Sequence, residues 1–77
     1  MPVLVRLQYC VIAMFFEDHN PPHFHVLGKD GRDAQVRLGE LSVINGTVDR
    51  RALNEAIEWA KQNSDYLKER WDAFQDR

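Results

Sequence analysis

The spacing of apolar residues changes once along this 77-residue chain, close to residue 49, and that change decides most of the fold class. Before it, short runs rich in β-branched and aromatic residues are separated by glycine, proline and asparagine, which is typical of strands joined by turns. After it, apolar residues recur at intervals of three and four, which is typical of amphipathic helices. The sequence therefore predicts an α+β fold in which a small sheet precedes helices.

The first part of the chain predicts a small antiparallel β-meander of four to five strands. Turn residues divide it into short segments, and short connections of this kind join neighbouring antiparallel strands. Gln8 and Tyr9 form a bend or a bulge between the first two segments. The predicted strands cover residues 3–7, 10–16, 23–27, 34–38 and 41–44.

Two helices should follow the sheet, with Asp49 as the N-cap of the first and Ser64 as the N-cap of the second. Val48 and Leu53 would form a hydrophobic staple at the first helix start. Two amphipathic helices with a short link must cover an apolar surface, so we expect the pair to pack on one face of the sheet. The predicted buried residues are Leu53, Ala56, Ile57 and Ala60 in the first helix, and Leu67, Trp71 and Phe74 in the second.

Length and composition fit one globular domain over residues 1–77, since 44% of the residues are apolar and 29% are charged. The single cysteine, Cys10, excludes an intramolecular disulfide and is predicted to be a small buried apolar residue. The longest apolar run, residues 11–16, is too short for a membrane span or a signal peptide core. We therefore expect a cytoplasmic protein that does not associate with membranes. So small a core without disulfides favours self-association or a protein partner.

The formal net charge of −2 argues against a general nucleic-acid-binding protein, whose affinity comes mainly from neutralising phosphates. The excess of acidic residues lies in the second half of the chain. Residues 1–39 carry four basic and four acidic side chains, whereas residues 40–77 carry six and eight. The neutral first half can still meet RNA locally, and its candidate nucleic-acid contacts are Lys29 and Arg37, which would stabilise charge on a phosphate.

Every histidine of the chain lies within the eight residues 18–25. If residues 22–26 are extended, His23 and His25 project from one face of a strand, while Phe24 and Val26 point the opposite way, into the core. Two imidazoles about 7 Å apart on one face can converge on one metal ion or one phosphate. Histidine also titrates near neutral pH, so general acid–base chemistry is a second option for the pair.

The turn before this strand contains two prolines, and it can bring Asp18 or His19 back over the two imidazoles. An ordinary interpretation stays open: Asp18 and Asn20 bond the local backbone as turn residues, and the histidines cover the solvent side of a strand or bond to neighbouring carbonyls. The candidate catalytic residues are His23, His25, Asp18 and His19. The candidate ligands of a divalent metal are His23, His25 and Asp18.

Two further features have a functional and a structural interpretation. Arg50 and Arg51 at a helix start can touch phosphate, although cations there oppose the helix dipole, and a solvated helix end is the favoured interpretation. Trp59 lies on the flank of its apolar stripe, so it seals the edge of the core or anchors a partner.

The string Asp18-His19-Asn20-Pro21-Pro22-His23-Phe24-His25-Val26 resembles the signature of a small prokaryotic family, domain of unknown function 4160. The resemblance continues through residues 50–53 and 58–60 to Leu67 and Trp71, so it covers nearly the whole chain. It departs at Val48, where the family often has proline, and this affects only the geometry of the helix start. The site positions that the resemblance implies are Asp18, His19, Asn20, His23 and His25.

The resemblance implies no established activity. Members of the family are often encoded beside a second small protein, an arrangement that resembles toxin–antitoxin pairs, and this implies a small cognate partner and RNA as a target. We therefore expect a component of a toxin–antitoxin-like two-protein module, an RNA-directed toxin that uses the histidine cluster. A non-catalytic binding or regulatory module and a small metal-binding domain are the alternatives.

Overall fold

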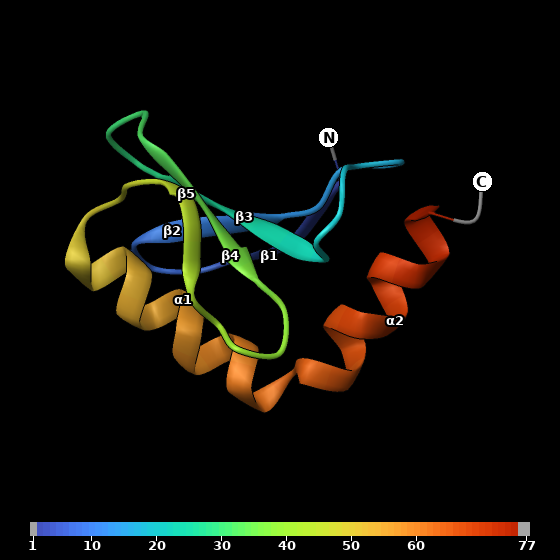
Figure 1. Cartoon of the computed structure of the whole chain (residues 1–77). Helices are drawn as coiled ribbons and strands as arrows, with labels where there is room; N and C mark the ends of the chain where they lie inside the picture. Colours follow the sequence, from blue (N-terminus) through green and yellow to red (C-terminus); the bar gives the residue numbers. More distant parts are fainter. Residues whose placement is uncertain (1, 76–77) are drawn as a thin grey trace.

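The computed structural model describes residues 2–75, which fold into one five-stranded antiparallel sheet followed by two helices (Figure 1). Strand order in the sheet follows chain order, so the sheet is a meander with its third strand at the centre. The predicted α+β meander followed by two helices is thereby confirmed. The strands are β1 (Val3–Arg6), β2 (Cys10–Ala13), β3 (His23–Gly28), β4 (Asp33–Arg37) and β5 (Val43–Gly46), and the helices are α1 (Arg50–Gln62) and α2 (Ser64–Gln75).

Two of the strands differ from the predicted bounds by more than one residue, and the other three differ by one residue at one or both ends. β2 ends three residues early at Ala13, because the chain then leaves the sheet to form the loop that precedes β3. β5 starts at Val43 and not at residue 41, because Leu41 takes a positive φ of 56° in the turn after β4. Gln8 and Tyr9 are the connection between β1 and β2, and the amide of Leu7 closes it by donating to the carbonyl of Cys10 at 2.8 Å.

α1 packs on the face of the sheet that Phe24 and Val26 occupy, and both of these side chains are fully buried, as predicted. The predicted buried face of this helix was wrong in part, since Leu53 and Ile57 are only half-buried. Alanine side chains at intervals of four residues form the buried face instead, because a methyl group lets the helix backbone approach the sheet closely. These buried alanines are Ala52, Ala56 and Ala60.

α2 diverges from α1 after Asn63 and ends beside the loop that joins β2 to β3 (Figure 1). Leu67 and Trp71 are buried in the same core as the α1 face, as predicted. Phe74 is half-buried and packs edge-on against Phe16, with ring centroids 4.8 Å apart. The carbonyl of Phe74 also accepts a hydrogen bond from the amide of Glu17 at 3.2 Å, so the last turn of α2 is tied to that loop.

The starts of both helices differ from the sequence expectation. Asp49 occupies the N-cap position of α1, but within the described residues its side chain makes no capping hydrogen bond, since its carboxylate accepts from Arg51 Nε at 3.3 Å. Ser64 is the first residue of α2 and not its cap. Asn63 takes the cap position, and its carbonyl accepts a hydrogen bond from the amide of Leu67 at 2.9 Å.

β5 is the exposed edge of the sheet, and all four of its residues are exposed. Val43 and Ile44 are 42% and 41% exposed, which places an apolar side chain on each face of this edge strand. Neither α1 nor α2 is long and apolar enough to cross a membrane, and no other helix is present in residues 2–75.

Candidate functional site

The two histidines of β3 share one face of the sheet, as predicted, with ring centroids 5.1 Å apart. That face is covered at this point, because His23 is only 3% and His25 only 7% exposed. The ring of Phe15 packs edge-on against His25 at 4.3 Å, and the ring of Trp71 lies 5.4 Å from that of His23. The interpretation in which the histidines cover the solvent side of a strand is therefore wrong.

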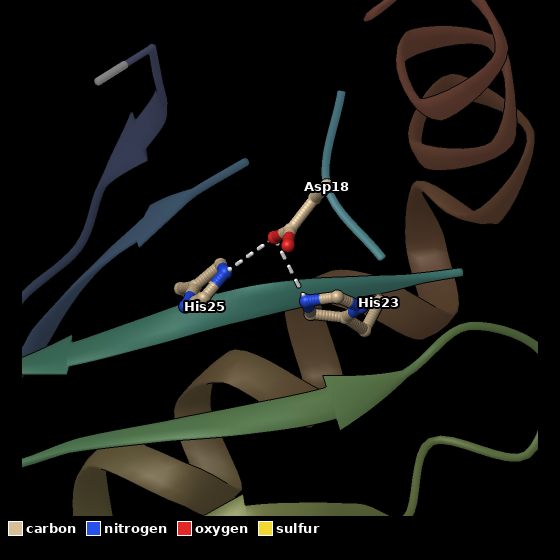
Figure 2. A group of neighbouring side chains, drawn as sticks. All are labelled: Asp18, His23 and His25. Carbon is tan, nitrogen blue, oxygen red and sulfur yellow. Dashed lines mark hydrogen bonds and ion pairs between the residues drawn. The ribbon is translucent and has the colours of Figure 1, made fainter. Parts of the chain in front are cut away.

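Asp18 lies in the loop between β2 and β3, and its carboxylate points at both imidazoles (Figure 2). A single oxygen, Oδ2, lies 3.0 Å from Nε2 of His23 and 3.0 Å from Nε2 of His25. The other oxygen, Oδ1, accepts a hydrogen bond from the backbone amide of His19 at 2.8 Å, which orients the carboxylate. We call Asp18, His23 and His25 the Asp18 cluster.

The surroundings of Asp18 keep its carboxylate ionised. Partial burial acts to raise the pKa of this carboxyl, but the hydrogen bonds from His25 and from the amide of His19, together with the nearby imidazoles, outweigh burial. The pKa of Asp18 is therefore held below its ordinary value of 3.8. The side chain of Asp18 is 18% exposed and is the most accessible member of the cluster.

The ring of His23 leaves one nitrogen without a partner. Its Nδ1 lies 2.7 Å from the carbonyl oxygen of Pro21, and because a carbonyl can only accept, Nδ1 carries a proton and donates it. In the neutral ring, Nε2 then presents a lone pair to the anionic oxygen of Asp18. Nε2 is buried and has no hydrogen-bond partner among the described residues. The short contact between Nε2 and Oδ2 is therefore unfavourable unless a positive charge joins the two atoms.

His25 is placed differently, since its Nε2 meets the geometry of a hydrogen bond to Oδ2 of Asp18 at 3.0 Å. In the tautomer with a proton on Nε2, the neutral ring donates to the carboxylate. His19 and Asn20 are both exposed and lie outside the cluster, although the backbone amide of His19 supports Asp18. The structure therefore brings together three of the four predicted catalytic residues and all three of the predicted metal ligands.

The two predicted phosphate contacts lie at opposite ends of the sheet. Arg37 on β4 pairs directly with His23, so both residues belong to the same face and the same end of the sheet. Its Nε lies 3.7 Å from Oε1 of Glu40. Lys29 follows the last residue of the six-residue strand β3, which places it roughly 20 Å along the strand from His23. Arg37 adjoins the Asp18 cluster, and Lys29 does not.

A cavity of about 450 Å³ has Trp71 in its wall, although no member of the Asp18 cluster lines it. Pro22 and Arg37 also line it, so three of its wall residues neighbour or contact His23. Its apolar wall includes Leu67, and its charged residues balance, with Arg37 and Lys68 against Asp65 and Asp72. Cavities of 300–1,000 Å³ are typical of sites for small ligands.

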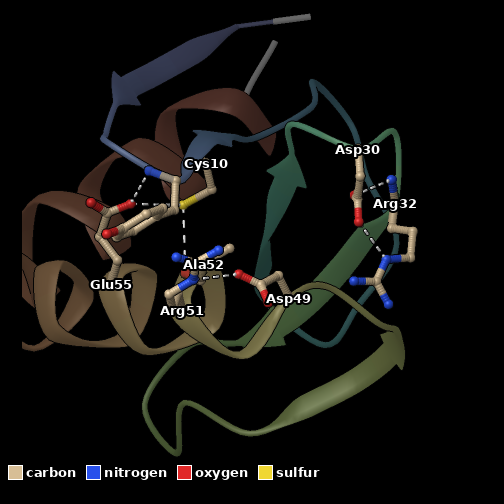
Figure 3. A network of polar contacts seen from close by, with 8 residues as sticks. Cys10, Asp30, Arg32, Asp49, Arg51, Ala52 and Glu55 are labelled. Carbon is tan, nitrogen blue, oxygen red and sulfur yellow. Dashed lines mark hydrogen bonds and ion pairs between the residues drawn. The ribbon is translucent and has the colours of Figure 1, made fainter.

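Sequence reasoning missed a second polar group, which we call the Glu55 cluster and which consists of Gln8, Tyr9, Cys10 and Glu55. Figure 3 shows Cys10 and Glu55 of this cluster. Glu55 reaches from α1 to the connection between β1 and β2. Its Oε2 accepts from the amide of Gln8 at 2.9 Å, and its Oε1 accepts from the amide of Tyr9 at 2.8 Å. A glutamate on a helix carries no signal in the sequence for backbone amides nearly fifty residues earlier.

Cys10 is fully buried beside Glu55, as predicted for an apolar position. Its Sγ lies 3.6 Å from the carbonyl of Ala52 and 3.6 Å from Oε1 of Glu55 (Figure 3). Burial, followed by the charge of Glu55, raises the pKa of the thiol from 9.0 to about 12. The thiol is therefore protonated at neutral pH, which fits a structural role and not that of a nucleophile.

Arg51 lies near the Glu55 cluster, and its guanidinium stands over the ring of Tyr9 at 5.0 Å. Together with Asp49 and Lys29 it lines a smaller cleft of about 350 Å³ at the start of α1. Trp59 is half-buried, and its ring packs edge-on against that of Tyr66 at 6.2 Å. Its use as an anchor for a partner stays a prediction.

Comparison with known proteins gives one family. A family model described as a domain of unknown function (DUF4160) matches residues 10–72, which include the Asp18 cluster, all of β2 to β5 and most of both helices. The comparison with curated proteins and the comparison with solved structures give no match.

Proposed function

This chain belongs to the DUF4160 family, and we propose that it is the RNA-directed component of a toxin–antitoxin-like two-protein module. The Asp18 cluster is the reactive centre in this proposal. The observation that carries it is the contact of a partly buried carboxylate with two buried imidazoles of the central strand, where one nitrogen has no hydrogen-bond partner among residues 2–75.

Such an arrangement lowers the free energy of unfolding, so a function is the reason to expect for its presence. Burying an ionised carboxylate costs free energy even when it is paired, and an unsatisfied buried nitrogen adds about 1–3 kcal/mol. Apolar side chains at these three positions would pack against Phe15 and Trp71 without that cost. Groups of this kind occur most often where a protein binds a ligand or carries out chemistry.

RNA as the target is supported by the surroundings of the cluster. Arg37 stands beside His23 and supplies a cation for a phosphate, and the nearby cavity has room for one nucleotide-sized ligand. Trp71 lies in its wall but is only 5% exposed, so it adds apolar contact there and not a free ring face for stacking. With a net charge of −2, we expect weak and local RNA contacts.

A protein partner is supported by β5. An exposed edge strand presents unpaired backbone groups to which a strand of another protein can add. Val43 and Ile44 place apolar side chains on both faces of this edge. This is where we expect a small cognate protein to bind.

The first test is expression of this chain alone in a bacterial host, with growth as the readout. Wild type should arrest growth, and the His23→Ala/His25→Ala double variant and the Asp18→Asn variant should not. His19→Ala is the matched control, since it removes a histidine of the same loop that lies outside the cluster. Circular dichroism of each variant establishes that it folds.

A second test uses purified chain and RNA, with and without added divalent metal. Cleavage that the cluster variants lose and the His19→Ala variant keeps supports the proposal. No growth arrest and no cleavage by wild type would overturn it and would favour the non-catalytic binding module. Arrest by every variant would remove the Asp18 cluster from the mechanism.

A further inference from the structure

We propose that the Asp18 cluster binds one divalent transition-metal ion of the zinc class, with Nε2 of His23, Nε2 of His25 and Oδ2 of Asp18 as its ligands. This inference rests on the proposed function only for the use of the site, and on geometry for its existence. One ligand atom from each of the three residues lies within 4.8 Å of the others.

The spacing of the ligand atoms fits such an ion. A tetrahedral ion with bonds of about 2.0–2.1 Å holds its ligand atoms roughly 3.4 Å apart. Both nitrogens lie 3.0 Å from Oδ2, so each of these two separations needs to lengthen by only a few tenths of an ångström, and the three ligand atoms all lie within 4.8 Å of one another. That is within the range of small side-chain rotations in the loop residue Asp18.

The unpartnered nitrogen of His23 is the second, independent observation. The carbonyl of Pro21 fixes the proton on Nδ1 and leaves the lone pair on Nε2, which is the form of imidazole that a metal binds. Metal-ligating histidines commonly donate their other N–H to a backbone carbonyl in this way, which fixes the tautomer and the ring orientation. The ring is 3% exposed, so this lone pair is directed into the cluster and away from solvent.

A proton between His23 and Asp18 is the competing explanation. A protonated ring would direct its Nε2–H at Oδ2 as a charge-assisted hydrogen bond, which prefers near-linear geometry. The two atoms are 3.0 Å apart but are not aligned as a hydrogen bond. A metal ion needs no such alignment between its ligands, because it sits beside the line that joins them.

The ligand set selects the class of ion. Two imidazoles and one carboxylate suit Zn²⁺, Fe²⁺, Mn²⁺, Co²⁺ or Ni²⁺, whereas Mg²⁺ and Ca²⁺ prefer oxygen ligands. Cys10 projects toward α1 on the opposite face of the sheet, so thiolate ligation is excluded here. Three protein ligands leave a coordination position open, which is the pattern of catalytic and not of structural zinc sites.

Metal binding also resolves a difficulty of access. The two imidazoles are too deeply buried to touch a polymer substrate directly. A metal ion held between them and the partly exposed Asp18 would be the group that meets a phosphate oxygen or a water molecule. The substrate class that this site would take is therefore a phosphodiester.

The test is metal binding by the untagged chain after removal of metal with a chelator, followed by titration with Zn²⁺, Mn²⁺ and Co²⁺ in a calorimeter. We expect one equivalent of at least one of these ions to bind. Asp18→Asn, His23→Gln and His25→Gln should each weaken binding by about tenfold or more, since loss of even a supporting partner has that effect. His19→Ala should bind as wild type does.

Circular dichroism of the metal-free variants shows whether each is folded. If a histidine variant does not fold, Asp18→Asn, which changes a loop residue, still tests the site. No binding of any of the three ions to folded wild type would overturn the inference, and so would equal binding by wild type and the three cluster variants. RNA cleavage that persists in chelator would overturn the use of the metal in the reaction and leave the proposed function intact. A chain that binds metal but cleaves no RNA would support the metal site and overturn the proposed function.

Discussion

The Asp18 and Glu55 clusters share one arrangement but differ in how completely their polar atoms are hydrogen-bonded. In each, one carboxylate contacts two nitrogen atoms. Glu55 gives each of its oxygens one backbone N–H, so every group in that contact is matched. Asp18 offers a single oxygen to two imidazole nitrogens, and in the neutral ring of His23 one of these has no proton to donate. The first cluster completes a turn of the backbone, and the second retains the capacity to bind a cation.

The largest effect that separates the two clusters should come from Glu55→Ala. It leaves the amides of Gln8 and Tyr9 without their acceptor, and two hydrogen bonds to a charged group contribute about 3 kcal/mol together. The melting temperature should fall by roughly 12–24 °C, as thermal unfolding followed by circular dichroism would show. Glu58→Ala is the control, since this exposed residue pairs only with Lys61 at 3.4 Å. Equal melting temperatures for the two variants would refute a structural role for Glu55.

Addition of metal should have the next largest effect, and only at the Asp18 cluster. A ligand that binds the folded state alone at a hundred times its Kd raises the free energy of unfolding by about 2.7 kcal/mol. Zn²⁺ should therefore stabilise wild type and Glu58→Ala by this amount, and Asp18→Asn by none. Thermal unfolding with and without Zn²⁺ measures the difference. Stabilisation of Asp18→Asn by the same amount would place the metal elsewhere.

Asp18→Ala in metal-free protein should have a smaller effect than Glu55→Ala. The variant deprives His25 of its acceptor, at a cost of about 1 kcal/mol, but it also relieves the unfavourable contact with the lone pair of His23. We expect a net loss below about 1 kcal/mol by urea unfolding. A loss as large as that of Glu55→Ala would mean that the Asp18 cluster is structural in the same sense.

The smallest effect concerns the thiol of the Glu55 cluster. Because the pKa of Cys10 is 9.0 in the unfolded chain and about 12 in the fold, its contribution to stability is complete below pH 9 and is lost as pH rises toward 12. Between pH 8 and pH 9.5, wild type should lose about 0.8 kcal/mol more than Cys10→Ala. Urea unfolding of both at the two pH values checks this. Parallel pH profiles would show that the thiol titrates normally.

Much of the fold could be predicted because it is local. Turn residues set the strands, and period-two alternation placed His23 and His25 on one face with Phe24 in the core. The contact face of α1 was misjudged at Leu53, because the sequence shows which residues are apolar but not how closely a helix must approach a sheet. The helix caps failed for a similar reason, since Asp49 had a nearer partner in Arg51.

The sequence could predict which residues of the candidate site lie together, but not what surrounds them. Asp18, His23 and His25 are close in sequence, so their meeting follows from one loop and one strand. Their burial depends on Trp71, which comes from the far end of the chain and which the sequence indicated only as a core residue. Pro21 contacts His23 through its backbone carbonyl, and the identity of a residue does not show where its carbonyl points.

The order of the strands along the sheet has a consequence for how the molecule forms. Each strand pairs with its neighbour in the chain, and folds dominated by such local pairing form quickly. All three members of the Asp18 cluster lie in the single hairpin of β2 and β3, whereas Trp71 lies in α2 and is synthesised later. During synthesis, the ligand atoms of the proposed metal site are therefore present well before α2 has been made. We expect a metal ion to bind at that stage and α2 to pack against the site afterwards.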